Sequence, residues 1–67
     1  MKKKEFETFI IKLIKNKKKR FKLVIKSKEI FYLTLNNIKH MFSSEVIIET
    51  SEYRVIPYSE IIEIKEF

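Results

Sequence analysis

The chain has 67 residues, one His, no Cys and no Asp, and its formal net charge is +6. A domain of this size buries only about 60% of the surface that its unfolded chain exposes, so it usually needs a staple or a partner. Without Cys, disulfides and thiolate zinc sites are excluded, and a single His makes other metal clusters improbable. We therefore expect no metal or other cofactor, a reducing cytoplasmic location, and oligomerisation as the extra source of stability.

Positive charge is concentrated in the first part of the chain. Residues 1–28 contain eleven Lys and one Arg against two Glu, which gives +10, whereas residues 29–67 carry −4. Such asymmetry indicates an anionic partner that is reached through one end of the molecule. No apolar run approaches the roughly 20 residues of a membrane span. The apolar stretch near the start is interrupted by Lys12 and Lys15, so we expect a soluble protein with no membrane partner.

The first predicted element is a helix over residues 1–16. Its apolar residues recur at helical spacing: Phe6, Phe9, Ile10, Leu13 and Ile14. We expect this stripe to cover an open end of the barrel described below. The alternative is an amphipathic helix that lies on a membrane surface.

Four consecutive cations follow the helix: Lys17, Lys18, Lys19 and Arg20. One interpretation of residues 17–20 is a solvated linker that is kept polar for solubility. The other is a patch that contacts phosphates, and such contacts by Lys are largely independent of sequence and strongly dependent on salt.

Residues 21–37 are typical of a β-hairpin. Phe21, Leu23 and Ile25 fall on one face of the first strand, and Phe31, Leu33 and Leu35 on one face of the second. This period of two predicts a sheet with one buried side and a polar turn at residues 27–29. Asn36 and Asn37 are expected to end the second strand in a left-handed conformation.

The remaining residues predict three more strands. Residues 38–44 are expected to form a loop, residues 45–50 and 53–56 two short strands, and Pro57 a break, because proline has no N–H for the ladder. Residues 58–60 suit a single helical turn before a last strand that begins at Ile61. The predicted fold is mainly β with one N-terminal helix, in which residues 21–67 form a small five-stranded antiparallel bent barrel, closed or partly open.

This order of elements resembles the Sm-like fold of the Sm, LSm and Hfq proteins, a relative of SH3-like barrels. The resemblance covers the whole chain: the helix EFETFIIKLIK, the strands FKLVIK and IFYLTLNN, the loop and strand IKHMFSSEVIIE, and the ending YRVIPYSEIIEI. The glycines that the family carries in its first turn and second strand correspond to Lys28 and Leu33. The resemblance implies a homo-oligomeric ring of six or seven subunits, formed between the fourth and fifth strands, that binds single-stranded U- or A-rich RNA.

Binding RNA in this way requires stacking surfaces, groups that read base edges, and positive charge. The candidates are Lys17, Lys18, Lys19, Arg20, Asn36, Asn37, His40, Met41, Phe42, Arg54 and Tyr58. For several of them a structural role is the alternative. His40 is equally suited to an ordinary surface loop, Phe42 and Tyr58 to a core or a subunit interface, and Arg54 to an ion pair with Glu49 or Glu52.

No nucleophile with an adjacent base, defined carboxylate pair or glycine-rich phosphate loop is present, so we do not expect an enzyme. The hypothesis from the sequence is a non-catalytic RNA-binding protein that forms an Sm-like ring. One alternative is a structural or protein-interaction oligomer whose lysines serve solubility. Another is a DNA-binding barrel of the kind that a phage or virus encodes.

Overall fold

A computed structural model describes all residues, 1–67. Its elements are α1 (Lys3–Lys15), β1 (Arg20–Ile25), β2 (Ile30–Thr34), η1 (Leu35–Asn37), β3 (Ile38–Met41), β4 (Glu45–Glu49), β5 (Tyr53–Pro57), η2 (Tyr58–Glu60) and β6 (Ile61–Glu66), where η marks a 3-10 turn. The fold is thus mainly β with one N-terminal helix, as the sequence predicted.

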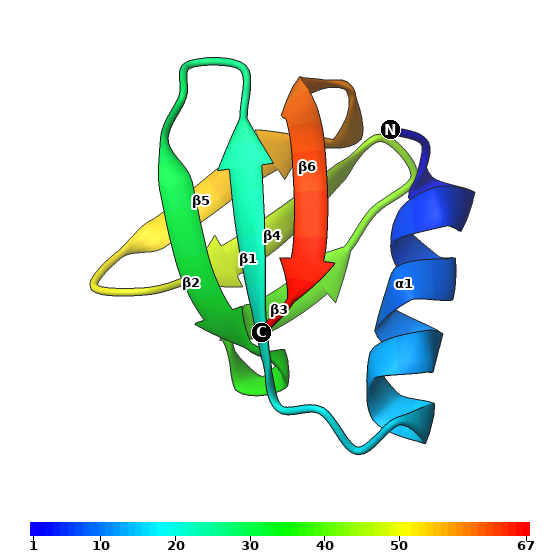
Figure 1. Cartoon of the computed structure of the whole chain (residues 1–67). Helices are drawn as coiled ribbons and strands as arrows, with labels where there is room; N and C mark the ends of the chain where they lie inside the picture. The colour runs from blue at the N-terminus through cyan, green and yellow to red at the C-terminus, as the bar shows by residue number, and fades with distance from the viewer.

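The six strands form two antiparallel sheets of three strands each. One sheet has the order β2–β1–β6 and the other β3–β4–β5. Figure 1 shows the first sheet in front of the second, with strands that run in clearly different directions, and α1 along one side of the pair. Two sheets that pack in this way bury their facing side chains in a common core.

The predicted five-stranded barrel is wrong in strand number and in closure. Residues 38–41, which we expected in a loop, form β3, and no strand pairing joins the two sheets into a barrel. The physical reason is the turn η1 between β2 and β3. The Thr34 N–H donates to the Asn37 side-chain oxygen at 2.7 Å, which ends β2 and sends the chain into the other sheet.

The left-handed backbone that we expected at Asn36 and Asn37 occurs elsewhere. Both residues lie in η1, and positive φ is found only at Lys17 (56°) and Lys28 (74°). Lys28 lies in the β1–β2 turn, at the position where the Sm-like resemblance places a glycine. A side chain at such a position costs energy that glycine would avoid, so the turn geometry outweighs the preference of the residue.

The helix begins and ends with defined hydrogen bonds. At its start, the N–H of Lys2 donates to a carboxylate oxygen of Glu5 at 3.1 Å. At its end, Lys17 and Lys18 donate back to the carbonyls of Ile14 and Leu13, both at 3.0 Å, in a Schellman arrangement. These contacts confirm the predicted helix to within one residue at its C-terminal end. Neither α1 nor the 3-10 turns combine the length and hydrophobicity that crossing a membrane requires.

The core consists of side chains from the helix and both sheets: Phe6, Ile10, Leu13, Phe21, Leu23, Phe31, Leu33, Val46, Ile48, Ile56, Tyr58 and Ile61. The predicted helical stripe is confirmed at Phe6, Ile10 and Leu13, and Phe9 packs edge-on against Phe21 at 5.8 Å. The prediction was wrong for Ile14, whose side chain is 58% exposed.

The alternation correctly predicted the buried side chains of the hairpin and of β4, which are Phe21, Leu23, Phe31, Leu33, Val46 and Ile48. It failed at the end of β1, where Ile25 is only half-buried and Val24 is buried beside a register shift against β6, and Leu35 is also only half-buried.

Phe6 tests whether α1 is an integral part of the core. It is fully buried and its ring lies 5.5 Å from that of Tyr58. We expect Phe6→Ala to lower the free energy of unfolding by about 3–5 kcal/mol, measured by urea denaturation, since it removes a large buried ring and leaves a cavity. The matched control, Ile11→Ala on the exposed side of the same helix, should change it by less than about 0.5 kcal/mol. Equal losses in the two variants would contradict this packing.

Candidate nucleic-acid interface

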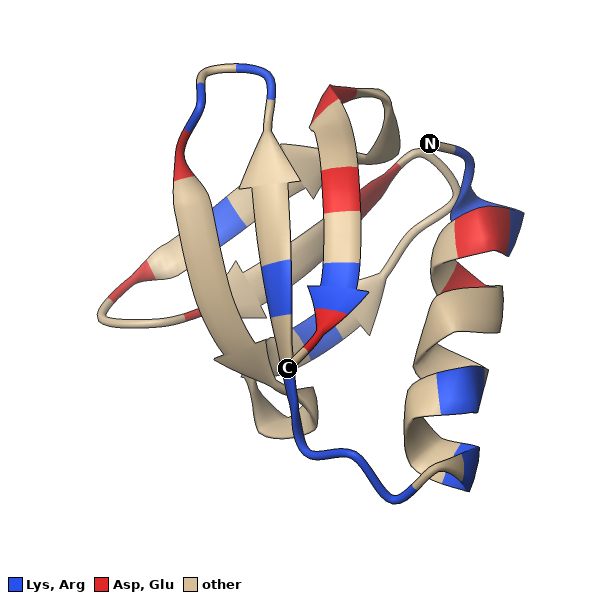
Figure 2. Cartoon of the chain, viewed as in Figure 1, with Lys and Arg blue, Asp and Glu red and all other residues tan.

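The basic loop (residues 17–20) leaves α1 through the Schellman turn and enters β1 at Arg20. Its backbone is anchored by the bonds from Lys17 and Lys18 to the helix, whereas the side chains of all four residues are exposed. None of these cations forms an ion pair, although four other basic residues do. In Figure 2 this connection is blue along its whole length. The loop therefore presents uncompensated positive charge on an ordered backbone.

Asn36 lies beside the basic loop. Together with Lys19, Thr34 and Leu35 it lines an open pocket of about 270 Å³. The Asn36 side chain is exposed and has no hydrogen bond within the protein, so its amide is free for a ligand. The structure thus brings together two of the predicted groups, the lysine run and an amide that can read base edges.

Asn37, its predicted companion, holds the turn instead. Its oxygen accepts hydrogen bonds from the N–H and the hydroxyl of Thr34, at 2.7 and 3.1 Å. Its NH₂ group donates to the Glu49 carbonyl at 2.7 Å, which ties η1 to the end of β4. An amide with these partners stabilises the connection between the two sheets, and it is not available to bases.

The predicted residues His40, Met41 and Phe42 lie on β3 and the turn that follows it, in the other sheet from Arg20. The rings of His40 and Phe42 are 4.2 Å apart, and both side chains are exposed. Met41 is half-buried and packs against the core. His40 and Phe42 thus form a small exposed ring pair, whereas Met41 supports the sheet.

Arg54 is engaged within the protein. Its guanidinium donates two hydrogen bonds to the carboxylate of Glu29, at 2.8 and 2.9 Å, and lies over the ring of Phe31 at 5.1 Å. This fork joins β5 to the residue before β2, so Arg54 links the two sheets. The ion pairs that the sequence suggested, with Glu49 or Glu52, are replaced by a partner on another strand.

Tyr58 is a core residue, which was one of the two structural alternatives predicted for it. It is 2% exposed, its ring packs on Phe6, and its hydroxyl donates to the Phe42 carbonyl at 2.9 Å. Burial, with a smaller contribution from Glu7, raises the pKa of Tyr58 above its ordinary value. It offers no face to a nucleic-acid base.

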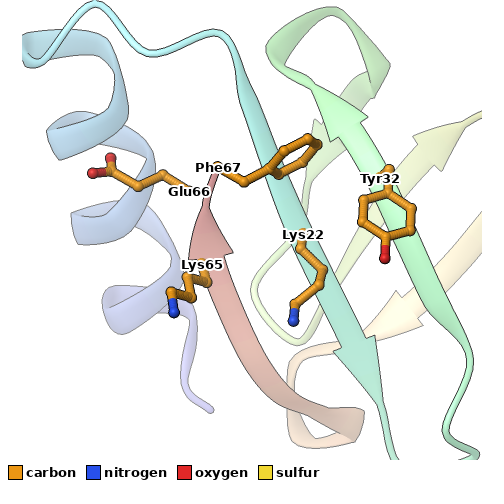
Figure 3. A pocket seen from close by; sticks show the side chains of 5 residues that line it. All are labelled: Lys22, Tyr32, Lys65, Glu66 and Phe67. Carbon is orange, nitrogen blue, oxygen red and sulfur yellow. The ribbon is translucent and has the colours of Figure 1, made fainter.

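The sequence analysis missed Tyr32, Lys65 and Phe67 on the outer face of the β2–β1–β6 sheet, where Lys22 and the predicted Arg20 also lie. Four of these five side chains, with Glu66, surround a shallow pocket of about 280 Å³. Figure 3 shows the side chains of Lys22 and Tyr32 beside each other, and the Phe67 ring extends toward them. The alternation that predicted the buried face also determined this one.

No group of three or more His, Cys, Asp or Glu side chains gathers in the structure. The groups available for binding are cations, the free amides of Asn16 and Asn36, and exposed aromatic rings. Comparisons with protein-family models, with curated proteins and with solved structures find no match.

The ion pair of Arg54 with Glu29 predicts a pH dependence of stability. The hydrogen bond from Arg54 lowers the pKa of Glu29 below its ordinary 4.5. A carboxyl whose pKa is lowered by folding stabilises the protein above its unfolded pKa, and this stabilisation is lost as the pH falls through the folded pKa. We expect Glu29→Gln to melt slightly below the wild type at pH 7 and to approach it at pH 3, measured by thermal denaturation. An equal difference at both pH values would contradict this role.

Proposed function

We propose that this protein binds single-stranded RNA without catalysing a reaction on it, and that it self-associates in the manner of Sm-like proteins. The observation that carries the proposal is the basic loop, in which four adjacent cations have no carboxylate partner. A phosphate backbone is the chemical partner that such a loop fits, because each phosphate contact releases counterions and needs no particular sequence.

The neighbouring groups favour an unpaired strand over a duplex. The free amide of Asn36 shares a pocket with Lys19, so a base edge can be read next to a phosphate contact. Exposed rings such as Phe42, which is 44% exposed, offer stacking surfaces to unpaired bases. The bases of a duplex are stacked on one another and cannot use these rings.

The topology supports an open arrangement of the Sm-like kind. β2 and β3 are separated only by η1, so the chain passes from one sheet to the other through a connection of three residues. The chain also ends with a strand, a 3-10 turn and a last strand, as that family's chains do. β5 and β6 are both edge strands, and Tyr53, Val55 and Ile62 on them are more than half exposed. Exposed apolar edges invite pairing with another copy.

The basic loop is tested by Lys17→Gly/Lys18→Gln/Lys19→Gln. Glycine is used at Lys17 because φ is positive there, so the turn is retained. We expect a loss of affinity for a 12-nucleotide RNA of at least about tenfold at 150 mM salt. The slope of log K against log salt should fall by about 2, since three phosphate contacts are removed. Fluorescence anisotropy at several salt concentrations measures both quantities.

A matched control removes the same charge elsewhere, with Lys2→Gln/Lys4→Gln/Lys28→Gly. Lys28 lies in the β1–β2 turn and also has positive φ. In Figure 1 this turn and the N-terminus lie at the end of the molecule opposite the basic loop. The control should lose little affinity. Equal losses would indicate that only net charge matters, and no RNA binding by the wild-type protein would refute the proposed function. Tighter binding to duplex DNA would favour the DNA-binding alternative.

Self-association is tested at β5 with Val55→Lys. Val55 is 55% exposed on this edge strand, so the substitution should leave the fold intact and place a charge in the proposed subunit contact. We expect light scattering to give a mass of about six or seven subunits for the wild type, as the resemblance implies, and of a monomer for the variant. Ile30→Lys, on the edge strand β2, is the matched control and should leave the mass unchanged. A monomeric wild type would contradict the ring.

A further inference from the structure

We infer that the outer face of the β2–β1–β6 sheet is a base-stacking surface for single-stranded nucleic acid, on which Tyr32 and Phe67 each receive a base. The inference rests on the proposed function, which it deepens by assigning a second part of the binding site. It starts from the strand register. Lys22 lies opposite Tyr32 on β2 and opposite Lys65 on β6, so these three side chains form one row across the sheet.

The aromatic platform (Tyr32 and Phe67) is built from two strands that do not adjoin. Phe67 follows β6, and its N–H donates to the Arg20 carbonyl at 3.3 Å. Its side chain reaches across β1 to Tyr32, where the ring centroids are 5.5 Å apart and the rings are almost perpendicular. Tyr32 is nevertheless 65% exposed and Phe67 56% exposed. Two large rings are therefore held in place by each other while most of their surface faces solvent.

Cations surround the platform. The Arg20 guanidinium lies over the Phe67 ring at 5.5 Å, and Lys22 and Lys65 line the pocket beside it. Two acidic groups offset part of this charge, since Glu63 pairs with Lys22 at 3.5 Å and Glu66 also lines the pocket. Figure 3 shows the Glu66 carboxylate on the side of α1, and the three cations Arg20, Lys22 and Lys65 still outnumber the two carboxylates. The face thus combines aromatic surface for bases with net positive charge for phosphates, which is the chemistry of single-strand binding sites.

The charge of this face decides between a nucleic acid and a second copy of the chain. If two copies met through the same face, Arg20, Lys22 and Lys65 of each would oppose one another, and like charges in contact are unfavourable. A single nucleic-acid strand supplies bases and negative charge together. A protein partner would have to present acidic groups opposite the three cations and apolar groups opposite the two rings.

The platform is continuous with the basic loop. Arg20 is the last residue of the loop and the first of β1, and it lies opposite Thr34, which lines the Asn36 pocket with Lys19. A strand can therefore keep its phosphates along residues 17–20 and place bases in the Asn36 pocket and on the two rings. Two rings and one amide pocket accommodate about three bases, fewer than a complete single-strand domain usually covers.

The decisive variant is Tyr32→Leu/Phe67→Leu, which keeps apolar volume and removes both rings. Its control is Ile11→Ala, because Ile11 is 54% exposed but lies on α1, outside both sheets and outside the proposed subunit contact. Anisotropy is measured with 12-nucleotide oligo(U) and oligo(A), and with an abasic oligonucleotide of the same charge. We expect the double variant to lose at least about tenfold in affinity for both RNAs, since one ring contributes roughly 5- to 150-fold. Its salt slope and its affinity for the abasic strand should not change.

Tyrosine fluorescence tests the platform even if the double variant folds poorly. The chain has no Trp and three Tyr, of which Tyr58 is buried. In a Tyr53→Phe background the exposed tyrosine is Tyr32 alone, so stacking of a base on it should quench the fluorescence, whereas the abasic strand should not.

The outcomes separate the two proposals. If the double variant binds RNA as tightly as the wild type while the basic-loop variant does not, the platform is overturned and the proposed function stands. Equal losses on RNA and on the abasic strand also overturn the platform. If the wild type binds no RNA at physiological salt, both proposals fail. If the double variant only changes the mass in light scattering, the face is a subunit contact, and the platform is again overturned.

Discussion

The contact between Phe6 and Tyr58 joins α1 to the turn between the two sheets. Phe6 brings α1 into the core, and Tyr58 lies in the turn between the two sheets, where its hydroxyl binds the Phe42 carbonyl and its N–H binds that of Ser44. Without disulfides or metal, a chain of this length relies on one shared core. The helix is therefore the third wall of that core, and its position determines where the chain leaves for β1.

The way the chain leaves the helix explains why the backbone of the basic loop is well defined. Lys17 is in the left-handed region, and the two hydrogen bonds back to α1 hold the following residues against the helix end. Positive charge near a helix C-terminus is favoured by the helix dipole. The cations thus have a structural reason to stand where they do, and because none of them is neutralised by a carboxylate, they remain available to an anion.

Four basic residues elsewhere on the surface differ in this respect, because Lys22, Lys26, Lys39 and Arg54 have acidic partners. The pairs of Lys22 and Lys39 join neighbouring strands, the pair of Lys26 joins the β1–β2 turn to η2, and the pair of Arg54 joins the two sheets. The Arg54 fork is the most specific, since it adds two hydrogen bonds and a stacked ring to the charge attraction. The paired cations therefore hold parts of the fold together, whereas the cations of the basic loop have no acidic partner.

The sequence by itself determined the helix, the hairpin, the buried faces of the strands and the exposed lysine run. Periods of 3.6 and 2 decide which side chains share a face wherever an element forms, so Phe6, Leu13, Leu23 and Leu33 were identifiable as core residues. Only the tertiary structure decided the roles of Arg54, Asn37 and Phe67. Their partners Glu29, Glu49 and Tyr32 are 25, 12 and 35 positions away. Such contacts depend on strand register and sheet order, and a local pattern contains no information on either.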